Sequence, residues 1–476
     1  MKHLVYTILA LYSCYVSAQD TPTALSLDQA IEYALKNNRQ SINAERDIAA
    51  AKEQKWETTA TGLPQLNANI DYQNFLKQQV SLLPAAAFDP LGSIRQLGDY
   101  YNLSDRQIQD LPPAPEGFIP VIFGTQQSMN ASATLSQLIF DGSYLVALQS
   151  AKVFLEISEN AKTKTDLEVR KAVITAYGNV LIAEESVEII EKNLEVLRKN
   201  LDETTKIYEN GLEEEESVEQ LQITLSGTES SLNYTVRLRE IAYQMLNVTL
   251  GVPVDSKITL TENLEDLTQD FVDMSLLGAD ADIESIVEYK IARNDKSAKE
   301  LMVKLEKSKA LPTISSFLNA GYSGFSDSFT FTNSDQNWFG SALLGVNLKI
   351  PIFSSFGRTA ATNRAEINLE KAKTELEETE QRLRLQINTV KSDYAFAIED
   401  YQNKVQSLRL AERIEQKNEV KFFEGITSSL ELRLAQVQLY SAQEEYLQSM
   451  LNVITAKAEL ESLVNQPTLT NLINSK

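Results

Sequence analysis

Long stretches of the chain place apolar residues at alternating intervals of three and four positions. The pattern runs over 169–208 and recurs over 218–249 and 432–463. A 3.5-residue period sustained over this length is typical of helices that coil around neighbours rather than of isolated surface helices. Many residues of this apolar seam are Ala, Ser or Thr, which favours close packing. The sequence therefore predicts long helices that pack along most of their length.

A glycine interrupts this pattern twice, and the two interruptions are copies of each other. Adding 214 to a residue number in the first copy gives its equivalent in the second, so that Gly211 corresponds to Gly425. A glycine inside a helical pattern favours a left-handed helix end. We therefore expect two helical hairpins with tips at these glycines. In the helix that precedes the second tip, Glu415 stands at the position equivalent to Leu201. We therefore expect the two hairpins to have different neighbours.

Shorter segments alternate apolar and polar residues, which is typical of strands with one apolar and one polar face. Ser316 and Phe317 weaken the alternation in one of these segments. Strands are expected at about 65–73, 128–140, 313–322 and 339–350.

These elements divide the chain into two repeats, each with the order helix, strand, loop, strand, long helix, tip, long helix. The first begins with a helix over 27–60, for which Ser26 is a candidate N-cap. We expect a signal peptide over 1–18, a first repeat over 19–250 with a long loop at 74–127, a linker or side element over 251–286, a second repeat over 287–466 and a C-terminal tail over 467–476.

The amino terminus has the features of an export signal. Lys2 precedes an apolar run, and the small residues before Gln19 predict cleavage between Ala18 and Gln19. A lipoprotein signal with acylation at Cys14 is the alternative, although the bulky Tyr12 fits it poorly. Either form predicts export.

Loss of this leader restricts the candidate chemistry. Cys14 is the only cysteine and His3 the only histidine. The mature chain is therefore expected to lack disulfides, thiolate or imidazole metal sites, and cysteine or histidine catalysis. No spacing indicates a paired-carboxylate site, so we expect neither an enzyme nor a cofactor nor a metal. The formal charge of −22 argues against nucleic-acid binding.

The strands suggest a membrane despite the polar helices. Each is about ten residues long, which is the length that tilted β-structure needs to cross a bilayer. Four strands cannot close a barrel, so several copies would have to share one. The alternative is an exported coiled-coil tether or scaffold of the cell envelope, with a small β-domain and no transport activity.

The ordered duplication resembles the TolC-like outer-membrane efflux protein family. The resemblance rests on the export signal, the repeated strand–strand–helix–tip–helix plan and the Tyr208-x-x-Gly211 and Phe422-x-x-Gly425 tips. It implies a mainly α-helical homotrimer. Its coiled-coil hairpins would form an α-barrel in the periplasm, continuous with a 12-stranded β-barrel in outer-membrane lipid.

The resemblance also implies partners and a role. A periplasmic adaptor would bind the helical tips and link them to an inner-membrane pump of the RND or ABC type. The trimer would be the passive exit duct of a tripartite efflux or type I secretion system.

Carried over by position, this resemblance assigns residues at the tips. The family often has acids six and nine residues after the second glycine; here these are Glu431 and Leu434, so the second acid is missing. The alternative for Glu431 is a solvated acid at a helix start, where the helix dipole favours it. The acidic run at the first tip is either a solvated turn or a docking surface for a basic adaptor. The expected gate is Glu431, Leu434 and Ser217, and the expected adaptor contacts are Gly211, Leu212, Glu213, Glu214, Glu215, Glu216, Gly425, Ile426 and Thr427.

Overall fold

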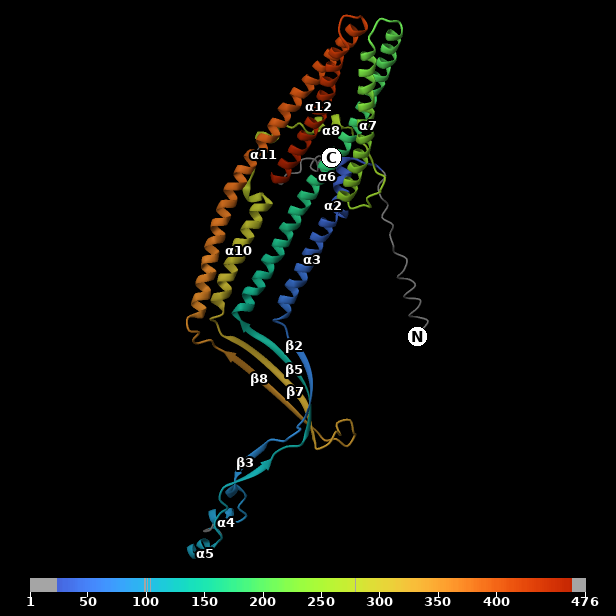
Figure 1. The fold of residues 1–476 in the computed structure, drawn as a ribbon. Coiled ribbons are helices and arrows are strands. Elements are labelled where there is room, and N and C mark those ends of the chain that lie inside the picture. The colour runs from blue at the N-terminus through green and yellow to red at the C-terminus, as the bar shows by residue number, and fades with distance from the viewer. Residues whose placement is uncertain (1–23, 98–99, 101, 103, 279, 465–476) are drawn as a thin grey trace. The chain divides into compact units, whose positions relative to one another are not determined.

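The structure is a computed structural model of the chain. The expected cleavage position between Ala18 and Gln19, the alternative site Cys14 and the expected tail 467–476 lie outside the described residues. The described residues are 24–97, 100, 102, 104–278 and 280–464 (Figure 1).

The chain divides into two compact units, and this division does not follow the two sequence repeats. Both halves of the sequence contribute helices to the first unit and strands to the second. The first unit comprises the described residues within 1–55, 149–304 and 360–476, and the second comprises those within 56–148 and 305–359.

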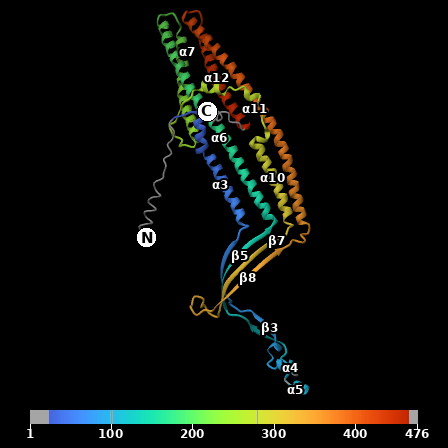
Figure 2. The same cartoon turned by 180° about the vertical axis from the view of Figure 1, so that it is seen from behind.

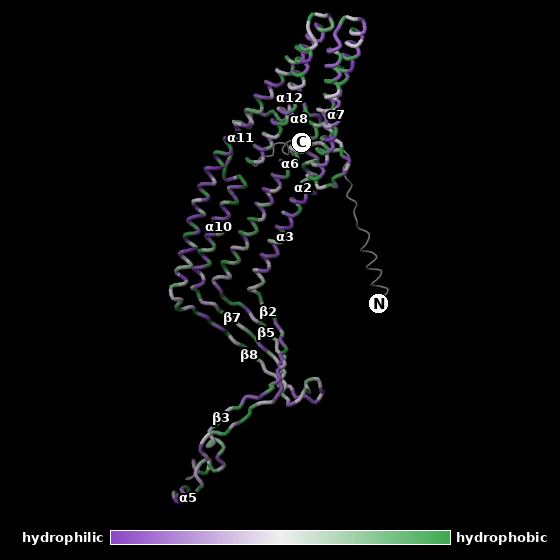
Figure 3. The backbone as a smooth tube through the Cα atoms, viewed as in Figure 1, coloured by the Kyte–Doolittle hydropathy of each residue, from purple (hydrophilic) through white to green (hydrophobic). Residues whose placement is uncertain are grey.

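Two long helical hairpins dominate the first unit, and they lie side by side in both views (Figures 1 and 2). Residues of the predicted seams, such as Val173, Val180 and Val453, are fully buried. Apolar and polar residues alternate along each helix (Figure 3). The helices are α6 (Gly142–Glu209), α7 (Glu215–Leu250), α11 (Gly357–Phe423) and α12 (Ser429–Val464).

The expected single helix over 27–60 is wrong, because Asn38 divides it into α2 (Leu27–Asn37) and α3 (Arg39–Ala60). Asn38 has an extended backbone with ψ of 134°. Its side chain donates a hydrogen bond to the Thr249 carbonyl at 2.7 Å and accepts one from the Gln40 N–H at 2.7 Å. The bond to Gln40 is local and caps α3, whereas the bond to Thr249 ties the break to α7.

The helix start expected at Ser26 is confirmed. Its hydroxyl accepts a hydrogen bond from the Gln29 N–H, and the Gln29 side chain accepts one from the Ser26 N–H, which forms a capping box.

The segment 251–286 is a packed part of the first unit. Its strand β6 (Thr259–Leu260) pairs in parallel with β1 (Ala24–Leu25). Helix α8 (Leu264–Phe271) buries Phe271 completely, and the Lys457 ammonium group lies 4.9 Å from the centre of that ring. The remaining elements here are α9 (Ser275–Gly278), η3 (Ile283–Ser285) and the following helix α10 (Val287–Ser308).

Gly251 ends α7 with φ of 85°, and a Cβ atom there would lie 2.2 Å from the Asn37 carbonyl oxygen. We expect Gly251→Ala to lower the thermal midpoint strongly. The left-handed backbone costs about 1–2 kcal/mol for a residue with a Cβ, and the clash would also push α2 from α7. Gly425→Ala is the control, because φ is 70° there and no atom lies within 4 Å. Equal losses in thermal melts monitored by circular dichroism would contradict the close approach.

The second unit holds a four-stranded antiparallel sheet with the order β2-β5-β7-β8. The central pair joins a strand of the first repeat to one of the second. Strands β2 and β8 are the outer strands, and neither pairs with a further strand in the described part of the chain. The strands are β2 (Gln65–Asn74), β5 (Gln127–Asp141), β7 (Thr313–Ser326) and β8 (Trp338–Lys349).

The register aligns like residues into rows across this sheet. One row is entirely leucine, and the row two residues along each strand is entirely alanine. Successive residues of a strand point to opposite faces, so these rows share one apolar face. The opposite face is mainly polar, and there the Asn319 side-chain amide donates to the Thr134 hydroxyl at 2.7 Å. The rows are Leu66, Leu135, Leu318 and Leu344, then Ala68, Ala133, Ala320 and Ala342.

The segment expected as a loop over 74–127 contains secondary structure of its own. Strands β3 (Val80–Pro84) and β4 (Phe118–Ile122) pair antiparallel as a second, smaller hairpin. Between them lie η2 (Ala85–Phe88), α4 (Gly92–Gln96) and α5 (Asp105–Gln109).

Candidate functional site

The two helical tips have the same backbone structure. At the first tip the Gly211 N–H donates to the Tyr208 carbonyl at 2.8 Å, and the Leu212 N–H donates to the Ile207 carbonyl at 3.1 Å. The second tip repeats both bonds at positions 214 residues later, with distances of 2.9 and 2.8 Å. Both glycines have positive φ. These are Schellman motifs, so the duplication seen in the sequence extends to the hydrogen bonds of the turn.

The tips contact each other through hydroxyl groups. The Ser217 hydroxyl lies 3.0 Å from the Ser429 hydroxyl and 2.7 Å from a carboxylate oxygen of Glu213. Ser217 is 5% exposed, and the apolar side chain of Leu432 is buried nearby in the same contact. A small polar junction therefore joins the start of α7 to the start of α12.

The three residues expected in a gate do not share one environment. Glu431 and Leu434 are exposed and lie three positions apart on α12, so they share a helix face. Ser217 instead lies in the junction between the tips. Glu431 is in the first turn of α12, where its N–H contacts the Ser428 carbonyl at 3.1 Å.

Most residues expected to contact an adaptor are exposed at the tips. Leu212 is 79% exposed and Ile426 is 67% exposed. Glu213 and Thr427 are half-buried, whereas Gly211, Gly425, Glu214, Glu215 and Glu216 are exposed. The first tip thus presents acids and an apolar side chain at the start of α7, where the helix dipole stabilises negative charge.

A polar layer inside the second hairpin lies further from the tip. Burial raises the pKa of the Glu415 carboxyl, and the Glu419 carboxylate raises it further, while a hydrogen bond with Gln436 opposes the shift. Burial, followed by the Glu415 charge, raises the pKa of the Tyr440 hydroxyl to about 12. Both groups interrupt the apolar packing of α11 and α12, as the irregular seam of this hairpin indicated.

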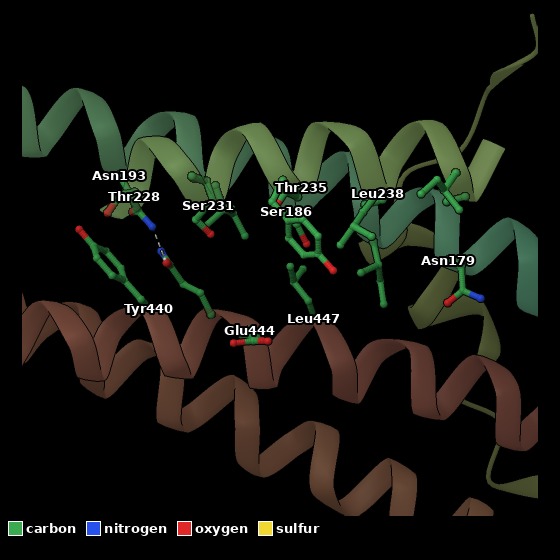
Figure 4. A pocket seen from close by; sticks show the side chains of 18 of the residues that line it. Asn179, Ser186, Asn193, Thr228, Ser231, Thr235, Leu238, Tyr440, Glu444 and Leu447 are labelled. Atoms are coloured by element: carbon green, nitrogen blue, oxygen red, sulfur yellow. Dashed lines mark hydrogen bonds between the residues drawn. The ribbon is translucent and has the colours of Figure 1, made fainter. Parts of the chain in front are cut away.

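A groove of about 620 Å³ separates the α6/α7 hairpin from α12 (Figure 4). One polar contact crosses it: the Asn193 side-chain NH2 donates to the side-chain oxygen Oε1 of Gln443 at 2.9 Å. Its apolar wall was not predicted from the sequence, and it lies one position before four of the seam residues of α7. A second apolar stripe beside the seam was the available signal. This wall contains Tyr234, Leu238, Ile241 and Met245.

No helix in the described ranges combines the length and apolar character needed to cross a bilayer. Nor do His, Cys, Asp and Glu residues there gather in threes as possible metal ligands.

Comparison with known proteins gives the fold a family. The sequence matches the outer membrane efflux protein family over residues 122–252 and 292–466. No curated protein matches the chain in sequence.

Several solved structures share the fold. The outer membrane protein VceC of Vibrio cholerae is 17% identical with a TM-score of 0.66, over 92% of this chain and 96% of that one. CusC, described in work on transmembrane channel formation, is 17% identical with a TM-score of 0.69, over 96% of this chain and 96% of that one. The open state of the MtrE outer membrane channel of Neisseria gonorrhoeae is 15% identical with a TM-score of 0.67, over 92% of this chain and 89% of that one.

The match covers more than half of the chain and includes both helical hairpins. The chain therefore belongs to the outer membrane efflux protein family, and it is a channel protein of the outer membrane that extends into the periplasm, not an enzyme.

Proposed function

We propose that three copies of this chain form the passive exit duct of a tripartite efflux or type I secretion system. The observation that carries the proposal is the four-stranded sheet, which has one apolar face, one mainly polar face and two outer strands, β2 and β8. A lipid-embedded sheet must pair every strand edge, because lipid offers no hydrogen bonds. Pairing β2 of one copy with β8 of the next would close twelve strands around a polar lumen.

Aromatic side chains support a membrane position for this sheet. Tyr72 lies 5.7 Å from Phe329 and 5.9 Å from Phe331, and Phe331 lies 6.2 Å from Trp338, measured between ring centres. They gather where β2 and β7 end and β8 begins. Aromatic girdles at the bilayer interface are typical of outer-membrane barrels.

In this proposal the helical tips bind a periplasmic adaptor, which connects the duct to an inner-membrane pump of the RND or ABC type. The exposed Leu212 and Ile426 offer apolar contacts. The groove beside α7 has the heptad-spaced apolar wall that an amphipathic adaptor helix would need. The pump supplies the energy, and the duct stays passive.

The acidic run at the first tip tests the electrostatic part of that docking. We expect replacement of Glu213, Glu214, Glu215 and Glu216 by lysine to slow association with the adaptor of the same organism, most strongly at low salt. Surface-based binding kinetics at several salt concentrations measure this. If the association rates of the wild type and the lysine variant depended equally on salt, the acidic run would be only a solvated turn.

A second prediction concerns the gate, which we assign to Glu431 and Leu434, with Ser217 holding the adjacent tips together. Three Glu431 carboxylates around the pore would favour cations, and three Leu434 side chains would narrow it with an apolar ring. We expect Glu431→Gln to reduce the cation preference of single channels in planar bilayers. Glu53→Gln, a change at an exposed position of α3, is the control. An unchanged reversal potential for Glu431→Gln would contradict the proposal that a ring of Glu431 carboxylates sets the cation preference.

The proposal as a whole is tested by the detergent-corrected mass of protein extracted from outer membranes. A trimer that conducts ions in planar bilayers supports the duct. A monomer or dimer released without detergent would overturn it in favour of an envelope scaffold. A trimer without conductance would indicate a tether.

A further inference from the structure

The small hairpin of β3 and β4 has a face with no polar side chain. The register pairs Val80 with Ile122, Leu82 with Pro120, and Pro84 with Phe118. Because paired residues point to the same side of a hairpin, these residues share one face. We call these six residues the apolar face of the hairpin. Its large side chains are open to solvent: Val80 is 47%, Leu82 65%, Phe118 69% and Ile122 54% exposed.

Such a face needs a partner. A two-stranded hairpin is marginally stable on its own in water, and packing against another surface is what usually stabilises it. An exposed patch of contiguous apolar side chains commonly marks an interaction site. The opposite face holds Ser81, Leu83, Ile119 and Val121. It is less exposed than the apolar face, and Ser81 is its one polar side chain.

The sequence of the hairpin argues against two kinds of occupant. Pro84 and Pro120 lack the N–H groups with which an added strand would pair, so strand addition at the edges is disfavoured. Anionic lipid headgroups would favour a cluster of Lys or Arg. Residues 80–90 and 112–122 contain neither and carry the acids Asp89 and Glu116, and Lys77 is a single cation before β3. The apolar face itself carries no charge, so identical faces can meet without repulsion.

The hairpin is also attached to the strand at which copies are proposed to meet. The pairing of β2 with β5 continues past its last regular pair, because the Phe75 N–H donates to the Gln126 carbonyl at 2.9 Å. The Gln78 side chain then donates to the Gly124 carbonyl at 3.3 Å. Strand β2 is an outer strand of the sheet, so each copy carries one small hairpin next to its contact with another copy. The chain leaves β2 for this hairpin at the end of the strand opposite to its entry from α3.

We propose that the apolar faces of three copies pack against one another and form a lid over the outer mouth of the duct. This inference rests on the proposed trimer. The lid would be held by apolar contacts alone, with no ion pair or side-chain hydrogen bond to break. Cargo with apolar surface could therefore part the hairpins, while the closed lid would narrow the mouth and reduce the flow of water and ions.

Cysteine cross-linking tests the lid directly. Since Cys14 is the only cysteine in the sequence and lies in the expected leader, an introduced cysteine would be the only free thiol of the mature protein. We expect Leu82→Cys and Phe118→Cys to form covalent dimers when outer membranes are oxidised with copper phenanthroline. Ser81→Cys, one position away on the opposite face, is the matched control and should stay monomeric in non-reducing gels.

The outcomes separate this inference from the proposed function. A trimeric mass without cross-linking of either apolar-face variant would overturn the lid and leave the duct intact. A monomeric mass would overturn the duct and the lid with it. A polarity-sensitive dye attached to the thiol of the Leu82→Cys variant gives a further readout. If its emission shifted to the blue only in lipid vesicles, the hairpin would be seated in lipid and the lid would be wrong.

A second variant tests what the lid does. Leu82→Asp would place three carboxylates in the proposed contact, where their repulsion should separate the hairpins. We expect a several-fold higher single-channel conductance than in the wild type and in the control Ser81→Asp, with the trimeric mass unchanged. Equal conductance in all three proteins would show that the hairpins do not obstruct the mouth.

Discussion

Replacing Leu135 by arginine is expected to prevent assembly of the protein in the outer membrane. Leu135 belongs to the row of four leucines that crosses the apolar face of the sheet, near the middle of β5, β7 and β8 and near the start of β2. An arginine on the lipid face of a barrel costs about 2–4 kcal/mol at the bilayer midplane, and a trimer would contain three. We expect trimer bands on semi-native gels of outer-membrane fractions to disappear.

Thr134→Arg is the matched control, because Thr134 neighbours Leu135 on the same strand and points to the opposite face. The substitution removes the hydrogen bond that the Thr134 hydroxyl accepts from Asn319, which is worth about 1 kcal/mol. An arginine there would enter the polar lumen, so we expect normal amounts of trimer. Equal tolerance of both substitutions would mean that the apolar face does not contact lipid.

The alternating sequence pattern predicted the strand that carries Leu135 and Thr134. Alternation over 128–140 was enough to assign Leu135 and Thr134 to opposite faces of one strand. It could not pair that strand with β7 of the second repeat, because periodicity fixes which face a residue occupies and not which strand lies beside it. The leucine row became visible only with the register.

Other features depend on single contacts that no period reveals. Asn38 ends α2 because its side chain bonds to Thr249, a residue 211 positions away. Phe271 packs the segment 251–286 into the core of the first unit, whereas its acidic composition left open whether it is a linker or a side element. Ser217 was predicted to stand with Glu431 and Leu434, but its contact with Ser429 holds it between the tips. In each case a partner distant in sequence determines the position.

A buried ion pair in the first unit gives the largest stability prediction. A guanidinium nitrogen of Arg170 lies 3.4 Å from a carboxylate oxygen of Glu461, and their side chains are 9% and 2% exposed. Removing one partner of a buried pair costs about 3–5 kcal/mol, because an unpaired charge stays in the core. We expect both Arg170→Met and Glu461→Leu to lower the thermal midpoint of the extracted protein strongly.

Because Asp28 responds to the charges of both Arg170 and Glu461, we expect the two single variants to lose different amounts of stability. Burial raises the pKa of the Asp28 carboxyl, Arg170 lowers it and Glu461 raises it. Arg170→Met would therefore remove the guanidinium that lowers the pKa of Asp28, and this pKa should rise further. A carboxyl whose pKa is higher in the folded state than in the unfolded state favours folding as the pH falls through the folded value. We expect acidification to recover stability in Arg170→Met more than in Glu461→Leu.

The double variant Arg170→Met/Glu461→Leu separates the contribution of the pair from the penalty of an orphaned charge. Replacing a buried pair by apolar side chains of similar volume is often neutral or stabilising. We therefore expect the double variant to melt above both single variants. Breaking the exposed pair of Lys36 and Glu32 with Lys36→Met is the control and should change the midpoint little. If the double variant lost as much as both single variants together, the two side chains would act independently, and there would be no coupling energy between Arg170 and Glu461.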